Sequence, residues 1–162
     1  MLKVKLQGAD GRIFKVDYEV ARKFAPIEAV LHTHDLQTPI FVGKMSSRVL
    51  KRVIRWARYH LDDELVELSE EHRFTELCPR DAAFLNVNPS KLFELLIAAS
   101  YFEMQDLILT TSKAIANKIA AQTVEQIRET FEIENDFTAN EERRVQEKNA
   151  WCGGLPVLDM EQ

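Results

Sequence analysis

The spacing of apolar residues changes once along the chain, and this change limits the fold to a small sheet joined to many helices. Apolar and polar residues alternate over residues 2–7, which is the pattern of a half-buried strand. A glycine-containing turn at 8–11 and a return strand over 13–16 complete a predicted hairpin. A third strand is predicted over 38–42, where Pro39 stands near the start and costs little hydrogen bonding.

Elsewhere the apolar residues follow the helical period. Asp17, Ser46 and Asn88 stand where they can cap helices, and Thr-x-x-Gln/Glu capping boxes begin at Thr123 and Thr138. The segment after Asn88 is apolar on almost every side, so we expect it to be buried on most sides. Helices are predicted over 18–24, 26–31, 46–61, 81–85, 88–102, 107–119, 123–131 and 138–152. The fold class is therefore α+β.

Charge is divided unevenly along the 162 residues. Residues 1–60 hold twelve basic and five acidic residues, whereas residues 61–162 hold nine and twenty-one, which gives the whole chain a net charge of −5. This asymmetry indicates two functional regions, and the acidic balance disfavours nucleic acid as a partner. The acidic stretch 62–80 is predicted to be a solvated, flexible loop, and the segment after Cys152 is predicted to be a disordered tail.

No membrane or secretory feature is expected. The longest apolar run is five residues, 95–99, against roughly 20 needed to span a bilayer. The first residues alternate charged and apolar side chains and so contain no signal-peptide core. Cys78 and Cys152 are too few and too far apart for a disulfide framework, which favours a cytoplasmic or nuclear location.

The motifs that carry catalysis or metal binding are not found. Gly43-Lys44-Met45-Ser46 resembles a phosphate loop only in part, because Thr38 and Met45 occupy the positions of the first glycine and the final hydroxyl. His32 and His34 have no metal-ligand motif around them. We therefore expect no catalytic residue, no metal site and no cofactor.

Two helices leave a functional alternative open. One is the predicted helix 46–61, whose basic residues could bind the phosphates of a nucleic acid. A solvated face or a surface for an acidic protein is favoured, because no aromatic platform accompanies these residues. These residues are Arg48, Lys51, Arg52, Arg55 and Arg58. The other is the last helix, in which Val145 and the terminal Trp151 are the only large apolar side chains. It is predicted to be either a solvated surface helix or a segment that orders on a partner.

Several segments resemble one known family, the Skp adaptors that link cullins to F-box receptors in SCF ubiquitin ligases. The string Asn135-Asp136-Phe137-Thr138 and the closing Asn149-Ala150-Trp151-Cys152 are the most specific. The resemblance also covers residues 5–7, 10–11, 13–17, 50–56, 92–101, 116–119, 127–131, 134 and 147–148. It thus extends from Leu2 to Cys152.

The resemblance implies both a fold and a set of roles. A BTB/POZ-like unit over 1–102, with a small three-stranded sheet, would face a cullin N-terminal domain through Ser100 and Tyr101. C-terminal helices over 103–152 would bind F-box proteins, and 153–162 would be a tail. The apolar positions of the F-box groove would be Ile108, Ile115, Ile119, Ile127, Phe131, Ile133, Val145 and Trp151. The implied function is a non-catalytic adaptor, which could form a homodimer when no F-box partner is bound.

The chain also departs from the family pattern. Ser100 stands where members commonly carry Asn, and Pro79-Arg80-Asp81 stands where they usually have an aromatic residue. The long acidic loop of many members is reduced to residues 33–37. These departures imply a divergent paralogue, and they leave open an alternative in which the protein is a scaffold that keeps the F-box groove but no longer recruits a cullin.

Overall fold

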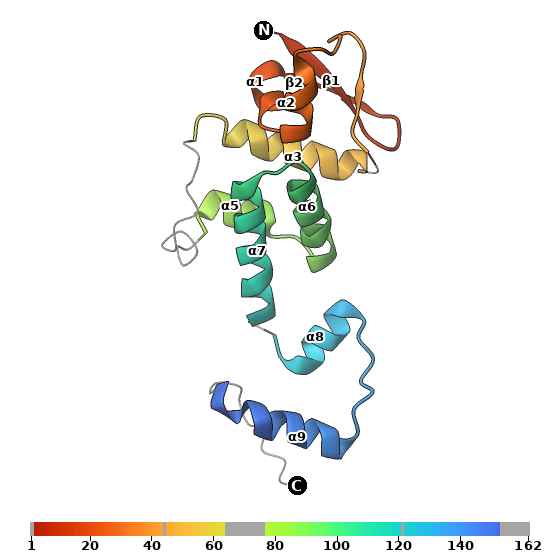
Figure 1. The fold of residues 1–162 in the computed structure, drawn as a ribbon. Helices are drawn as coiled ribbons and strands as arrows, with labels where there is room; N and C mark the ends of the chain where they lie inside the picture. The colour runs from red at the N-terminus through yellow and green to blue at the C-terminus, as the bar shows by residue number, and fades with distance from the viewer. Residues whose placement is uncertain (1, 44, 64–76, 121, 153–162) are drawn as a thin grey trace. The chain divides into compact units, whose positions relative to one another are not determined.

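The computed structural model describes residues 2–43, 45–63, 77–120 and 122–152 (Figure 1). Two compact units divide the chain, Met1–Ala121 and Gln122–Gln162. The predicted flexible loop falls largely outside the described residues, because 64–76 are not described, and the predicted tail lies wholly outside them.

A three-stranded sheet lies at the N-terminal end of the first unit, in the order β2-β1-β3. Strands β1 (Lys3–Gln7) and β2 (Ile13–Asp17) form the predicted antiparallel hairpin, in which Val4 pairs with Val16. Gly11 has a φ of 79° in the turn, which a residue without a Cβ adopts readily. Strand β3 (Ile40–Phe41) pairs in parallel with β1 and is shorter than predicted.

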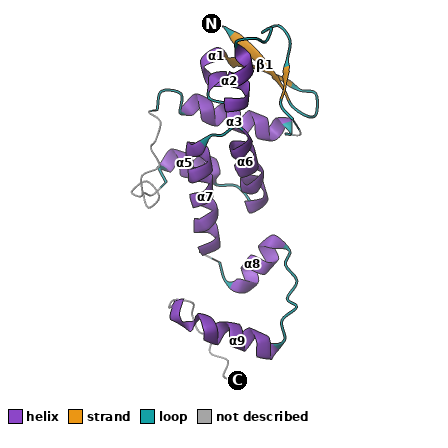
Figure 2. Cartoon of the chain, viewed as in Figure 1, coloured by secondary structure: helices purple, strands orange, loops and turns teal. Residues whose placement is uncertain are grey.

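Six helices of the first unit are described (Figure 2). Their bounds are α1 (Tyr18–Arg22), α2 (Ala25–Leu31), α3 (Ser47–Tyr59), α5 (Pro79–Leu85), α6 (Pro89–Tyr101) and α7 (Gln105–Ala120). The predicted caps of α3 and α6 are confirmed, since the Ser46 and Asn88 side chains accept hydrogen bonds from backbone N–H groups three residues later. The predicted side-chain cap at Asp17 is wrong, because this carboxylate instead pairs with Lys3 at 3.7 Å.

The core of the first unit joins the sheet to α1, α3, α6 and α7. Its largest fully buried side chains include Trp56, Phe24 and Phe102. The rings of Phe24 and Phe102 lie 4.7 Å apart between centroids, which brings the segment after α1 against the end of α6. Such aromatic pairs contribute about 1 kcal/mol beyond the area that they bury.

The prediction that α6 is buried on most sides is wrong for one face. Leu92, Leu95 and Ala99 are buried, but Ile97 is 71% exposed and Tyr101 is 47% exposed. The apolar pattern could not show that no element covers this face. An exposed apolar strip on a helix otherwise packed in the core marks a candidate interaction surface.

The second unit contains α8 (Val124–Phe131), α9 (Ala139–Asn149) and a short 3-10 helix, η1 (Ala150–Cys152). Both predicted capping boxes are confirmed, at Thr123 and at Thr138. Neither α8 nor α9 has a buried residue. Arg128 on α8 and Glu142 on α9 form an ion pair at 3.1 Å. Local caps and this pair define the second unit, in place of a core.

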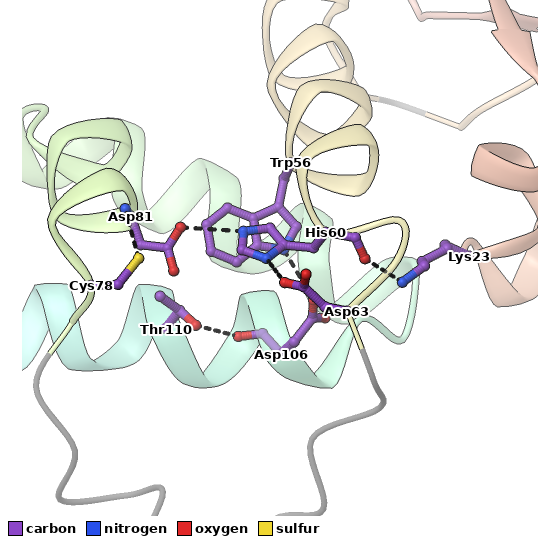
Figure 3. A network of polar contacts seen from close by, with 8 residues as sticks. All are labelled: Lys23, Trp56, His60, Asp63, Cys78, Asp81, Asp106 and Thr110. Carbon is purple, nitrogen blue, oxygen red and sulfur yellow. Dashed lines mark hydrogen bonds and ion pairs between the residues drawn. The ribbon is translucent and has the colours of Figure 1, made fainter.

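A polar network lies at the C-terminal end of α3 (Figure 3). His60 stands between two carboxylates, with Nδ1 2.5 Å from Asp63 and Nε2 3.2 Å from Asp81 at the start of α5. Lys23 donates to the His60 carbonyl oxygen at 2.5 Å. The network therefore ties the ends of α1, α3 and α5 together through one residue.

Trp56 connects the same end of α3 to α7. Its side chain is 1% exposed, and its ring stacks on His60 with the centroids 4.1 Å apart. The indole N–H donates to Asp106 at 3.1 Å (Figure 3). A buried donor that reaches a charged acceptor contributes more than an ordinary hydrogen bond.

We expect Trp56→Phe to lower the free energy of unfolding by about 1–3 kcal/mol, because it removes both the indole donor and buried volume. Urea denaturation followed by circular dichroism measures this change. Trp151→Phe is the matched control, since Trp151 is 82% exposed, and its effect should stay within about 0.5 kcal/mol. Equal losses in the two variants would contradict the role of the indole–Asp106 bond.

Candidate functional site

An open groove of about 420 Å³ lies between the segment that follows β3, the start of α3 and the exposed face of α6. Its floor is apolar, and Glu94 is the one carboxylate among its lining residues. The lining residues are Val42, Gly43, Met45, Ser46, Val49, Glu94, Ile97, Ala98 and Tyr101. An apolar depression with few polar groups suits the insertion of a partner's side chain.

Tyr101, the last residue of α6, lines this groove. The next residue, Phe102, is fully buried, and the two rings meet edge to face at 5.2 Å. Gly43 has a φ of 49°, and a Cβ placed there would lie 3.8 Å from the Tyr101 hydroxyl. The backbone of Tyr101 is thus fixed by the core while its ring stays accessible, which is the arrangement of a preorganised anchor.

Ser100 is exposed beside Tyr101 at the C-terminal end of α6. The structure therefore brings the two predicted cullin-facing residues onto accessible positions of one helix end. Their contact with a cullin stays a prediction.

Sequence reasoning missed Ile97, the most exposed large apolar side chain of α6. It lies four residues before Tyr101, so the two share a helix face. That spacing is a signal that could have found it. Phe41 on β3 is also 63% exposed, but a strand of two residues gives too short an alternation to predict this.

The three predicted groove residues on α7 differ in accessibility. Ile108 is half-buried against the core, Ile115 is 9% exposed and belongs to the core, and Ile119 near the helix end is 36% exposed. Ile119 therefore offers the largest exposed fraction of the three to a partner, and their roles stay predictions.

The five predicted groove residues of the second unit are all at least partly accessible. Ile127 and Phe131 on α8 are half-buried. Ile133 is 54% exposed, Val145 is 44% exposed and Trp151 is 82% exposed. Isolated helices of this length are marginal in water, so a partner that covers these side chains would contribute much of their stability.

Two further exposed apolar residues in the second unit were missed. Val124 is 44% exposed at the start of α8, and Phe137 is 48% exposed just before α9. Phe137 lies inside the most family-specific string, but the sequence alone gave it no groove role. The apolar surface of the second unit is thus wider than predicted.

Electrostatics fix the start of α9. Glu141 accepts hydrogen bonds from the Thr138 backbone N–H at 2.9 Å and from its hydroxyl at 2.7 Å. These bonds hold the pKa of Glu141 below its ordinary value. The helix begins at a defined residue although nothing in α9 is buried.

Among the described residues, the titratable side chains form no metal site. In the ranges that the structure describes, no three His, Cys, Asp or Glu side chains gather in a way that could hold a metal ion. Cys78 is exposed, and its sulfur accepts from the Asp81 backbone N–H at 3.4 Å, which caps α5. Across the same ranges, none of the helices combines the length and the apolar character needed to cross a membrane.

The first unit combines a small three-stranded sheet with packed helices, and C-terminal helices with exposed apolar side chains follow it. These features define an α+β protein of the POZ type with C-terminal helices. Residues 2–62 match the tetramerisation domain of the Skp1 family, and residues 105–152 match its dimerisation domain. The chain belongs to the Skp1 family, which confirms the resemblance and the predicted fold class.

Similar proteins cover nearly the whole chain. A Skp1-related protein of Caenorhabditis elegans is 36% identical over 159 residues, which cover 92% of this chain and 90% of that protein. The SCF ubiquitin ligase complex proteins SKP1a and SKP1b of Dictyostelium discoideum are each 32% identical over 157 residues, covering 92% of this chain and 94% of those proteins.

Proposed function

We propose that this chain is a non-catalytic adaptor of an SCF-type ubiquitin ligase, which joins F-box substrate receptors to a cullin scaffold in the cytoplasm and nucleus. One observation carries the proposal, namely membership of the Skp1 family over nearly the full chain, with relatives named as SCF complex proteins. The function follows from this kinship rather than from the POZ fold alone, because one fold serves many functions.

The groove beside α6 supports the cullin contact. Tyr101 and Ile97 present two apolar side chains on one helix face, next to a depression that can accept a side chain of the partner. Large anchors on rigid elements supply most of the affinity of protein interfaces. In this proposal residues 1–102 bind the cullin, and residues 103–152 bind the F-box protein.

The second unit supports the F-box contact. Its helices have good caps but no buried side chain. In the proposal, an F-box protein covers this apolar surface and orders α9. When no F-box protein is present, a second copy of the chain covers it and forms a homodimer, in keeping with the dimerisation domain that matches residues 105–152.

A second candidate function follows from Ser100. A serine has a shorter side chain than asparagine and lacks its amide hydrogen bonds. If the partner requires that amide, the protein is an F-box-binding scaffold that no longer recruits a cullin. A pulldown with a cullin N-terminal domain, with and without an F-box protein, separates the two functions.

Tyr101→Lys should weaken cullin binding by about 30-fold, because loss of an interface anchor costs about 2 kcal/mol. Binding of an F-box protein should be unchanged, and isothermal titration measures both affinities. Tyr59→Lys is the matched control, since Tyr59 is 45% exposed on α3, away from the groove-lining residues. Equal loss of both partners would show that Tyr101 serves the fold instead.

Ser100→Asn is the companion variant and should strengthen cullin binding if the departure from the family pattern weakens it. A cullin affinity that stays unmeasurable in both the natural chain and Ser100→Asn would favour the scaffold function.

Trp151→Ala should reduce the affinity for an F-box protein more than it reduces the melting temperature of the free chain, since the indole is exposed when no partner is bound. A cap contributes about 1 kcal/mol, which cannot offset the ordering of a dozen residues at roughly 1–2 kcal/mol each. Amide hydrogen exchange should therefore be fast over 138–152 and slow once an F-box protein binds. Strong protection in the dilute free chain would contradict this role for α9.

Neither cysteine should carry ubiquitin as a thioester. In the sequence, neither cysteine has a partner that would activate it, and Cys78 serves as a helix cap. After incubation with activating and conjugating enzymes, non-reducing electrophoresis should show no adduct that a thiol reagent removes. A reducible adduct lost in Cys78→Ser or Cys152→Ser would overturn the non-catalytic assignment.

A further inference from the structure

The outward face of α3 carries five cations and no carboxylate. At 3.6 residues per turn, they fall within an arc of roughly 120° around the helix. We call them the basic stripe, and its members are Arg48, Lys51, Arg52, Arg55 and Arg58. The opposite face is buried through Leu50, Val53 and Ala57. Packing therefore holds four members of the stripe at exposed positions of a rigid helix, while Arg52 at its edge is half-buried.

Three members of the basic stripe have no carboxylate partner among the residues that the structure describes. Arg48, Lys51 and Arg55 are exposed, and none of the ion pairs among the described residues involves them. Arg52, in contrast, donates to the Phe84 carbonyl oxygen at 2.5 Å and lies over the Phe84 ring. Within the described ranges, three cations without an ion pair thus stand on this helix face, while Arg52 and Arg58 contact other parts of the fold.

Arg52 lies close enough to its neighbour Arg55 for their charges to repel each other. Burial, together with the neighbouring Arg55, lowers the pKa of the Arg52 guanidinium. An anion bound along the face would relieve this repulsion.

A carboxylate lies beside each end of the basic stripe. Asp10 accepts a hydrogen bond from Ser47 at the first residue of α3. Asp17 lies 4.0 Å from Arg58 at the other end. From Arg48 to Arg58 the helix rises about 15 Å, which equals roughly four to five residues of an extended peptide. A longer anion would meet these carboxylates.

We propose that the basic stripe binds a short acidic segment of a partner protein, a run of about five Asp or Glu residues whose length matches the face between the two carboxylates. This site is additional to the groove beside α6 and to the apolar surface of the second unit. It adds a docking point that the adaptor function does not require.

Charge argues for a short protein segment over a nucleic acid. Residues 61–162 carry twelve more acidic than basic residues, so a long polyanion is repelled by the rest of the protein. At physiological salt, screening acts over about 8 Å, and a short segment on the stripe escapes most of this repulsion. Tyr59 is the exposed ring on α3, and one of its faces is already covered by the Arg80 guanidinium, 4.0 Å from the ring centroid, which leaves less aromatic surface for stacking a base.

The test is fluorescence anisotropy of the full chain with a labelled penta-glutamate peptide, at low and at physiological salt. The triple variant Arg48→Gln, Lys51→Gln, Arg55→Gln should bind about tenfold more weakly, since exposed ion pairs contribute up to about 1 kcal/mol each. The matched control is Arg143→Gln, Arg144→Gln, Lys148→Gln, which removes the same charge from exposed positions of α9. It should bind like the natural chain.

Three outcomes would overturn the proposal. Equal weakening in the two triple variants would show that only net charge matters. Binding of a penta-thymidylate strand as tightly as the peptide, lost in the α3 variant, would make the stripe a nucleic-acid site. Self-association in sedimentation runs that disappears in the α3 variant alone would make a second copy of the chain the occupant.

Discussion

The burial of one face of α3 is the constraint on which the rest of the first unit depends. The helix packs its apolar side against α6, and Trp56 reaches α7 through the hydrogen bond to Asp106. Because this face is fixed, the other sides of the helix are fixed too. The start of α3 then forms one wall of the groove, and the outward side holds the basic stripe in line. A single packing interaction thus positions two separate surfaces.

The sequence predicted most elements of the fold because their signals are local. Alternation gave the hairpin, and Ser46, Asn88, Thr123 and Thr138 marked helix starts through the side chains that cap them. Asp17 failed as a side-chain cap because the fold offers it cations from elsewhere in the chain, Lys3 and Arg58. Tertiary ion pairs of this kind cannot be read from neighbouring residues.

The candidate site was less predictable than the fold. Ser100 and Tyr101 came from the family resemblance. The exposure of Ile97 was missed because the whole segment after Asn88 was predicted to be buried on most sides, and apolar periodicity does not tell which face a neighbour covers. The exposure of Val145 and Trp151 agrees with the prediction that the last helix, which has few apolar residues, is not held in a core. The exposure of Val124 and Phe137 was not predicted, because each stands alone in a polar context where no period marks it.

The parallel pairing of β3 with β1 has a consequence for the order in which the molecule assembles. The hairpin partners Gln7 and Ile13 lie close along the chain, whereas Leu6 must meet Ile40 across two intervening helices. Closing the longer loop costs more chain entropy, and the two residues of β3 form few hydrogen bonds to offset that cost. We therefore expect the segment after β3, which supplies Val42 and Gly43 to the groove, to become ordered after the hairpin.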